Sequence, residues 1–330
     1  MIYIKNDNND PHFNLALEEY VLKYLDPKEN YVFLWQNEPS VIIGRNQNTI
    51  EEINSDYIKE KGINVVRRLS GGGAVYHDLG NLNFTFIMGI QEESDVNNFK
   101  KFTAPVIKAL ARFGIKAELS GRNDITIDGK KFSGNSQYSY KNQLLHHGTI
   151  LFNSDLSVVQ NALNVKQEKI ESKGIKSVKS RVTNVYPYLE EKITVKEFEE
   201  ALLKYLLEED TENKEYILTE ENLKEIRRMM EERYLKWEWN YGESPKYSIQ
   251  KNKRFPWGGL EVRLEVKSGV IKDCAIFGDF FSHGEIEDLE QNLRGVQYKE
   301  EEVLKALEGI DLSIYFKGIE DGDFIGCVFS

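Results

Sequence analysis

Two segments in the first third of the chain carry apolar residues at helical spacing. In residues 11–25 apolar side chains recur every three or four positions, and a proline is well tolerated at the start of a helix. Residues 96–113 repeat the pattern, and Gly114 supplies a C-terminal stop. The pattern predicts two amphipathic helices. Their apolar positions are Phe13, Leu17, Tyr20, Val21 and Tyr24, then Phe99, Phe102, Val106, Leu110 and Phe113.

Shorter apolar runs between these segments predict strands. Residues 31–35, 40–44 and 63–68 are rich in β-branched and aromatic residues, which favour strands. In residues 81–88, Leu82, Phe84 and Phe86 alternate with Asn83 and Thr85. This period of two predicts a strand with one core face and one polar face.

A hairpin is predicted over residues 124–138, because Asp128-Gly129 is a strong signal for a tight turn between strands. Residues 144–152 form a further apolar run, which we expect to pair beside the hairpin. Thr194 with Glu197, and Thr219 followed by two glutamates, are capping signals for two charged helices reaching to about Lys236.

A change of composition follows these helices. Residues 240–252 are rich in turn formers and predict a linker. Beyond it, residues 258–278 alternate as a hairpin and residues 300–310 have a helical pattern, enough for a small α+β accessory domain. We therefore expect one domain over residues 1–243 and a second over residues 244–330.

Composition excludes several classes of function. The chain has 330 residues and a formal net charge of -11, which argues against general affinity for nucleic acid or an anionic membrane. Its two cysteines, Cys274 and Cys327, have no metal-ligand or disulfide spacing. The N-terminus lacks the apolar core of a signal peptide, and the apolar runs are too short to span a bilayer. We expect a cytoplasmic protein with reduced thiols.

Residues 67–73 place two arginines against three glycines. Glycines let backbone amides approach an anion closely, although a tight turn between strands requires them equally. The segment matches neither of the common nucleotide-binding glycine motifs. Arg67 and Arg68 end a predicted strand and must face opposite ways, so only one of them can serve the loop and hold a phosphate. The other is expected to be structural.

The predicted hairpin carries a second polar cluster. Strand alternation predicts Lys131, Ser133 and Asn135 on one face and Lys130 on the other. Lys131 would then be a half-buried cation near the glycine loop, whereas a solvated hairpin edge is the alternative. Asp124 is a candidate ligand for a divalent cation, or an acceptor for backbone amides.

Histidines and a lysine-rich segment offer weaker signals. His77 follows the glycine loop and is a candidate for lining a pocket, while His146 and His147 must face opposite ways in a strand. A core histidine with satisfied hydrogen bonds is the alternative for each. Residues 165–185 concentrate positive charge, including Lys179 and Arg181, in an otherwise acidic chain. This segment is either a solvated loop or a flap over an anion.

Five motifs in order closely resemble the lipoate–protein ligase family: "RRLSGGGAVYHDLGN", "GRNDI", "GKKFSG", "HHGTILF" and "KSVKSRVTN". The match extends to "NLALEE" near the N-terminus and "WEWNYGESP" before the linker. The resemblance implies an α+β fold, with a mixed or antiparallel sheet and flanking helices related to those of biotin–protein ligases and class II aminoacyl-tRNA synthetases. A small C-terminal accessory domain commonly follows in that family.

The resemblance also implies an activity: ATP-dependent joining of lipoate, through lipoyl-adenylate and with Mg²⁺, to a lysine of an apo lipoyl domain. The implied acceptors are the E2 subunits of 2-oxoacid dehydrogenases and the glycine cleavage H protein. Lys131 matches the lysine that touches both phosphate and acyl carbonyl. The other implied positions are Arg68, Gly73, Ala74, Val75, Tyr76, Lys179 and Arg181 for the adenylate, Ser70, Gly71, Gly72, His77 and His147 for lipoate, and Asp124 for Mg²⁺.

Alternatives remain open within and beyond this family. An octanoyl or lipoyl transferase of the cysteine type needs a thiol in the catalytic domain, and both cysteines lie after residue 270. A transferase that uses a lysine is not excluded in this way. A non-catalytic sensor of lipoate or its adenylate, or an RNA-binding relative of the synthetases, is a different class. The retained Lys131 and glycine loop count against a sensor, and the acidic balance counts against RNA binding.

Overall fold

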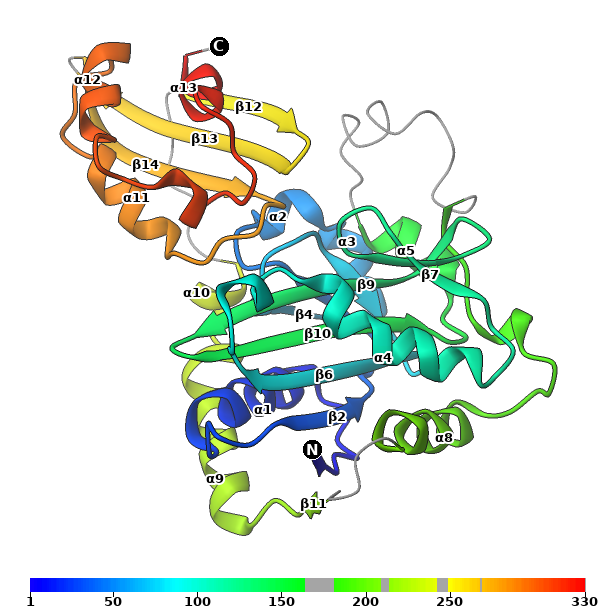
Figure 1. Cartoon of the computed structure of the whole chain (residues 1–330). Coiled ribbons are helices and arrows are strands. Elements are labelled where there is room, and N and C mark those ends of the chain that lie inside the picture. Colours follow the sequence, from blue (N-terminus) through cyan, green and yellow to red (C-terminus); the bar gives the residue numbers. More distant parts are fainter. Residues whose placement is uncertain (164–180, 209–213, 242–248, 268, 330) are drawn as a thin grey trace.

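The computed structural model describes residues 1–163, 181–208, 214–241, 249–267 and 269–329. Its centre is an eight-stranded sheet in the order β11-β1-β2-β6-β10-β9-β8-β7 (Figure 1). Strand β1 pairs in parallel with β2 and β11, and the other pairs are antiparallel. The strands are β1 (Ile2–Ile4), β2 (Tyr31–Trp35), β6 (Asn81–Gly89), β7 (Ala117–Ser120), β8 (Asp124–Ile127), β9 (Lys130–Tyr140), β10 (Gln143–Leu151) and β11 (Lys214–Tyr216).

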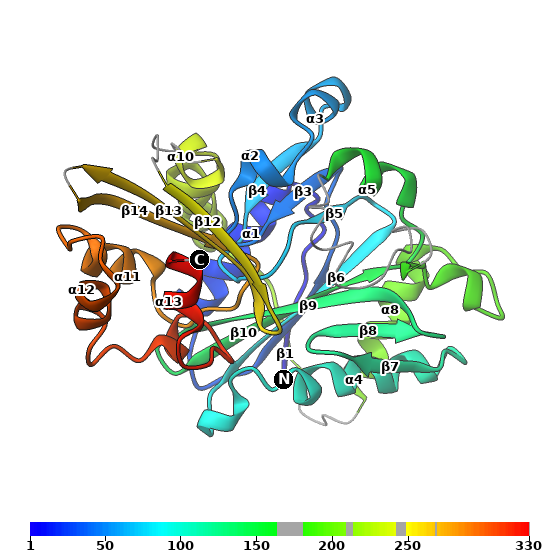
Figure 2. The ribbon, with the colours of Figure 1, turned by 90° about the horizontal axis from the view of Figure 1, so that it is seen from above.

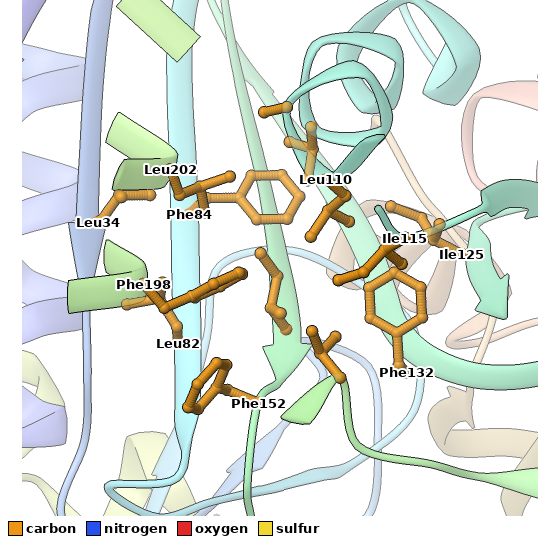
Figure 3. Close-up of a cluster of buried hydrophobic side chains, with 14 of the residues drawn as sticks. Leu34, Leu82, Phe84, Leu110, Ile115, Ile125, Phe132, Phe152, Phe198 and Leu202 are labelled. Carbon is orange, nitrogen blue, oxygen red and sulfur yellow. The ribbon is translucent and has the colours of Figure 1, made fainter. Parts of the chain in front are cut away.

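One face of this sheet is apolar. Phe84, Leu82 and Leu34 pack there against α4 (Phe99–Ala111) and α8 (Val195–Leu207), which contribute Leu110, Phe198 and Leu202 (Figure 3). The helix pattern predicted over residues 96–113 is thus confirmed, with its apolar stripe on the sheet. Thr194 and Glu197 form the predicted capping box of α8.

The opposite face of the sheet is partly polar but is also buried. Helix α1 (Pro11–Tyr24) packs on this side with Leu17 and Val21 against Phe33. Asn83 and Thr85, the predicted polar face of β6, are 2% and 0% exposed. A buried polar face requires hydrogen-bond partners or a ligand.

A small three-stranded sheet covers the same side (Figure 2). It consists of β4 (Asn64–Arg67), β3 (Ser40–Ile43) and β5 (Val75–His77) in that order, with β3 parallel to β4 and antiparallel to β5. The glycine loop, residues 70–73, connects β4 to β5. It therefore lies over the polar face of the main sheet, where the hydroxyl of Ser136 in β9 donates to the Gly71 carbonyl at 2.8 Å.

Short helices α2 (Thr49–Glu52), α3 (Ser55–Lys61) and α5 (Leu156–Ala162) lie beside this small sheet, and α9 (Glu220–Met229) packs on α1. A π-helical turn (Met230–Tyr234) and α10 (Trp237–Asn240) follow α9. The helical run that begins at Glu220 thus ends at Tyr234, close to the predicted end at about Lys236, and α10 is a separate short helix that begins after the extended Lys236. Short 3-10 turns lie at Glu93–Asp95, Tyr186–Tyr188 and Leu312–Ile314.

The C-terminal residues form an antiparallel sheet, β12-β13-β14, with helices packed on one side (Figure 2). The strands are β12 (Ile249–Phe255), β13 (Gly258–Lys267) and β14 (Val270–Gly278), and the helices are α11 (Ile286–Leu293), α12 (Glu300–Ala306) and α13 (Asp323–Val328). The predicted hairpin and the helix near residue 300 are confirmed. The predicted linker was too long, because β12 already begins at residue 249. A hydrophobic cluster drawn, among the described residues, only from the range 249–329 forms its core.

Turns in the C-terminal residues contact the glycine loop and the turn before β8 directly. The Arg122 guanidinium lies 4.2 Å from the ring centre of Phe281, and its Nη1 donates to the Trp257 carbonyl at 2.5 Å. The Gly72 amide reaches the Phe280 carbonyl at 3.5 Å. No helix in the described part of the chain is long and apolar enough to cross a membrane.

Candidate active site

A pocket opens between the glycine loop and the polar face of the main sheet. Trp35 pairs with Asn83, Asn83 pairs with Thr149, and the Gly134 amide donates to the Thr149 hydroxyl at 3.1 Å. These four residues form a row across β2, β6, β10 and β9, and at about 4.8 Å per strand the row spans roughly 14 Å. The lining residues are Leu15, Trp35, Ile42, Arg68, Gly72, Gly73, Ala74, Val75, His77, Asn83, Asn123, Lys131, Gly134, Asn135, Ser136, His147, Gly148 and Thr149.

Arg68 shapes the glycine loop from beneath. Its Nη2 donates to the carbonyls of Gly71 and Gly73 at 2.6 and 2.9 Å. Its Nη1 donates to the Ile42 carbonyl and its Nε to the Ser70 hydroxyl, at 3.2 and 3.1 Å. The side chain is 5% exposed, and burial lowers its pKa to about 10. The donors expected to hold a phosphate are thus directed at the loop itself, so Arg68 acts first by fixing the loop.

Arg67 extends in the opposite direction, as strand alternation predicted. Its Nη1 donates to three backbone carbonyls of residues 44–47, and its Nη2 donates to the Thr49 hydroxyl at 2.7 Å. Its Nε donates to the Trp239 carbonyl at 2.8 Å. Arg67 ties the segment after β3 to α10, which confirms the structural role expected for one of the two arginines.

Lys131 stands at the open end of the pocket. Its side chain is 40% exposed, and its Nζ lies 2.7 Å from Oδ1 of Asp124 on the neighbouring strand. The backbone amide of Thr183 donates to the Lys131 carbonyl at 2.8 Å, so the C-terminal end of the lysine-rich segment contacts this strand. Arg181 lies two residues before Thr183, whereas Lys179 lies outside the described residues. Lys130 is exposed.

A β-bulge corrects the predicted face of this strand. Asp124 pairs with Gly134 and Ile125 with Ser133, but Thr126 pairs with Lys131, which leaves Phe132 as an extra residue. A bulge reverses the alternation. Lys131 therefore shares the pocket with Gly134 and Ser136. Asn135 also lines the pocket, but its side-chain Oδ1 accepts from His146 Nε2 on the other face. Ser133 is 1% exposed and does not line the pocket, so the prediction that Lys131, Ser133 and Asn135 share a face was wrong.

His147 belongs to a buried chain of hydrogen bonds. Its Nδ1 lies 2.9 Å from a carboxylate oxygen of Glu18, and its Nε2 lies 2.6 Å from the Ser70 hydroxyl. Because the carboxylate can only accept, the Nδ1 of His147 carries a proton. The chain links Glu18 on α1 to the glycine loop. Ser70 thus positions His147 rather than lining the pocket, and Gly71 contributes carbonyl contacts to Arg68 and Ser136.

His146 faces the other way, as predicted. Its ring stacks on Phe102 at 5.0 Å between centroids, and both ring nitrogens have side-chain partners. It is a satisfied core histidine. Tyr76 is likewise turned away from the pocket into a hydrophobic cluster around Val41, so only its backbone can face a nucleotide.

Among the residues not singled out from the sequence are Trp35 and Asn83, which line the pocket, and Glu18, which does not line it. Trp35 sits within an apolar strand, and Asn83 was recognised only as one of two residues on a polar face. Glu18, which supports the site through His147, lies on the buried side of α1 and is 3% exposed. A carboxylate in an otherwise apolar helical stripe was the available signal for Glu18.

The fit of Mg²⁺ depends on the carboxylates near Lys131. Within the described residues no group of three or more histidine, cysteine, aspartate or glutamate side chains could hold a metal. Mg²⁺ on a nucleotide needs only one or two carboxylates, because the phosphates and water supply the remaining ligands. Asp124 fits that requirement and would have to share its carboxylate with Lys131.

Comparisons with known proteins cover the whole chain. Residues 10–207 match the lipoyl protein ligase A/B catalytic domain, and residues 244–328 match the bacterial lipoate protein ligase C-terminus. The lipoate-protein ligase LplJ of Bacillus subtilis is 52% identical over 100% of both chains.

Three solved structures are similar in fold. The crystal structure of LipL1 of P. falciparum in complex with lipoate is 30% identical, with a TM-score of 0.77 over 99% of this chain and 97% of that chain. A bipartite lipoate protein ligase of Thermoplasma acidophilum, described with its E2 lipoyl domain, has a TM-score of 0.66 at 29% sequence identity. The match covers 75% of this chain and 98% of that chain. A crystal structure of lipoate-protein ligase A bound with ATP has a TM-score of 0.63 at 27% sequence identity, and the match covers 73% of this chain and 98% of that chain. This chain belongs to the lipoate–protein ligase family.

Proposed function

We propose that this protein joins lipoate to a lysine of an acceptor protein at the expense of ATP. The observation that carries the proposal is the pocket itself: Lys131 and the glycine loop stand at one end, and a buried groove runs from them across four strands to Trp35. A long, largely apolar acid with one terminal carboxylate fits such a shape. Structures of two relatives, described with lipoate and with ATP, support both substrates.

In the first step, a carboxylate oxygen of lipoate attacks the α-phosphorus of ATP and pyrophosphate leaves. Two anions must meet, so the site has to offset their repulsion. Lys131 Nζ can donate hydrogen bonds to both the carboxylate and the α-phosphate. The backbone of residues 73–76 approaches the nucleotide, and Arg68 keeps that loop in place. Arg181 and Lys179 are proposed as further phosphate contacts.

In the second step, the ε-amine of the acceptor lysine attacks the acyl carbon, and AMP leaves. Lys131 remains protonated and stabilises the negative charge that develops on the acyl oxygen. Asp124 would contribute one carboxylate ligand to a Mg²⁺ ion carried by the nucleotide. That ion would neutralise part of the phosphate charge. Gly72, His77 and His147, with Ser70 and Gly71 behind them, form the lipoate side of the pocket.

The acceptors we propose are apo lipoyl domains of E2 subunits of 2-oxoacid dehydrogenases, as the description of the Thermoplasma acidophilum relative suggests, and the glycine cleavage H protein. Residues 1–243 would form the catalytic domain and residues 244–330 the accessory domain. The separate hydrophobic cluster of residues 249–329 supports this boundary. We place the reaction in the cytoplasm, where ATP is available.

A mass-spectrometric assay tests this function. The protein is incubated with ATP, Mg²⁺ and lipoate, with and without an apo lipoyl domain. We expect lipoyl-adenylate and pyrophosphate without the acceptor, and a lipoylated lysine plus AMP with it. A protein that binds lipoate but forms neither product would be a sensor and would refute the proposal.

A thiol-based transferase predicts a different response to cysteine replacement. Cys274 and Cys327 are 1% and 0% exposed within the C-terminal cluster, and burial raises the pKa of Cys327 to about 11 and that of Cys274 further. Neither thiol is suited to carry an acyl group. We expect the Cys274→Ser/Cys327→Ser protein to ligate lipoate at the wild-type rate in an ATP-dependent assay. Loss of transfer from a folded double variant would instead support an acyl-cysteine intermediate.

A further inference from the structure

The closed end of the pocket combines apolar walls with two polar side chains. Leu15, Ile42 and the Trp35 ring supply the apolar surface. The Trp35 indole N–H donates to the Thr85 hydroxyl at 2.9 Å, so the ring is held in one orientation. His77 and Asn83 line the same end and are 3% and 2% exposed. The chemistry proposed at Lys131 assigns no role to the polar side chains of His77 and Asn83.

The hydrogen-bond network fixes which nitrogen of His77 carries its proton. Asn14 Nδ2 contacts the carbonyls of Asn8 and Gln36, each at 2.9 Å, and these can only accept. The same Nδ2 contacts Asn37 Oδ1 at 2.9 Å, so the Nδ2 of Asn37 is the group that faces His77. It donates to His77 Nδ1 at 3.1 Å. Nδ1 is therefore the acceptor, and a neutral ring carries its hydrogen on Nε2.

His77 is neutral at physiological pH. Burial, with Arg68 and His147 nearby, lowers its pKa to about 3. Its Nε2 is thus a buried N–H donor, and it has no partner among the described residues. Asn83 also presents an unpaired donor. Its Oδ1 accepts from Asn81 Nδ2 at 2.9 Å, and its own Nδ2 is buried without a partner among the described residues. Unpaired buried donors are costly, so their presence beside a pocket indicates a ligand with an acceptor.

We propose that His77 Nε2–H, together with Asn83 Nδ2–H, recognises the ring sulfurs of lipoate and thereby selects lipoate over the straight-chain acid octanoate. Divalent sulfur is a weak hydrogen-bond acceptor and packs favourably against an aromatic ring, here Trp35. The terminal methyl of octanoate accepts no hydrogen bond and leaves both donors unpaired. A strongly hydrated end group would lose too much water among Leu15 and Ile42. The inference rests on the proposed function, because it places the carboxylate of either acid at Lys131.

The test compares two acids in one enzyme preparation. The rate of pyrophosphate release gives kcat/KM for lipoate and for octanoate in the wild type, in His77→Phe, which keeps a ring but removes the donor, and in Asn83→Leu. His12→Phe, the same substitution on α1 outside the pocket, is the control. For each pocket variant we expect the lipoate-to-octanoate ratio to fall by about 2- to 10-fold, the range for one modest hydrogen bond. The control ratio should be unchanged.

The measured quantity is the ratio of kcat/KM for lipoate to kcat/KM for octanoate. A partial loss of folded enzyme lowers both values equally and leaves this ratio unchanged. A ratio in His77→Phe and Asn83→Leu equal to that of the wild type would overturn the proposal, even if both rates fell. A wild type that releases no pyrophosphate with either acid would instead contradict the proposed function. Binding of each acid to the variants without ATP, measured by calorimetry, should change in the same direction as the ratio.

Discussion

Replacing Lys131 with alanine should lower the rate of lipoyl-adenylate formation by about 10²–10³-fold, the usual cost of losing one transition-state donor. The Nζ of Lys131 lies at the open end of the pocket and is the cation we place between the carboxylate and the α-phosphate. Its partner Asp124 would also be left without its 2.7 Å contact. Pyrophosphate release with lipoate and ATP measures the effect.

Lys130→Ala is the matched control for this prediction. It removes the same charge from the adjacent residue of β9, but that side chain is exposed and does not line the pocket. Its rate should remain within a factor of about two of wild type, as expected for a surface substitution. Equal rates for Lys131→Ala and wild type would remove Lys131 from the mechanism.

The second large effect is expected at Arg68. Arg68→Lys keeps a positive charge, but one ammonium cannot replace a planar fork that reaches Gly71, Gly73 and Ile42 together. The glycine loop should lose its fixed position, and misplacement by about 1 Å can cost on the order of 10²-fold in rate. We expect kcat/KM for ATP to fall by about that factor. Steady-state kinetics with saturating lipoate measure it.

A stability measurement separates loop geometry from global unfolding. Arg112→Lys, on an exposed pair with Glu208, is the control and should change neither rate nor stability appreciably. Arg68→Lys should lower the free energy of unfolding by about 1–3 kcal/mol, since buried carbonyls lose their donors. An Arg68→Lys enzyme with unaltered ATP kinetics would show that the loop does not depend on this guanidinium.

Most of the correct predictions about side chains at the site came from the alternation of side chains along strands. It separated Arg67 from Arg68 and His146 from His147, because the side-chain period of two holds wherever a strand is regular. It was wrong for Ser133 and Asn135, because one extra residue at Phe132 reverses the alternation. Nothing in the local sequence distinguishes this bulge from a regular strand.

Buried polar networks and long-range pairings were not predictable from local patterns. Glu18, Thr85 and His147 come from three separate segments, and their contacts exist only once α1 lies on the sheet. The parallel pairing of β1 with β11 joins three-residue strands more than 200 positions apart, so neither strand has a strong local signal. Helices α11 and α13 were also missed, and they are stabilised mainly by packing in the C-terminal cluster.

The central claim, activation of lipoate as an acyl-adenylate, is tested most directly by following carboxylate oxygen. Lipoate labelled with oxygen-18 in its carboxyl group is incubated with the enzyme, ATP, Mg²⁺ and an apo lipoyl domain, and the products are weighed. Attack of a carboxylate oxygen on the α-phosphorus transfers one labelled oxygen to the phosphate, so AMP should carry one oxygen-18 and pyrophosphate none. Lipoylated acceptor formed together with unlabelled AMP would contradict the account.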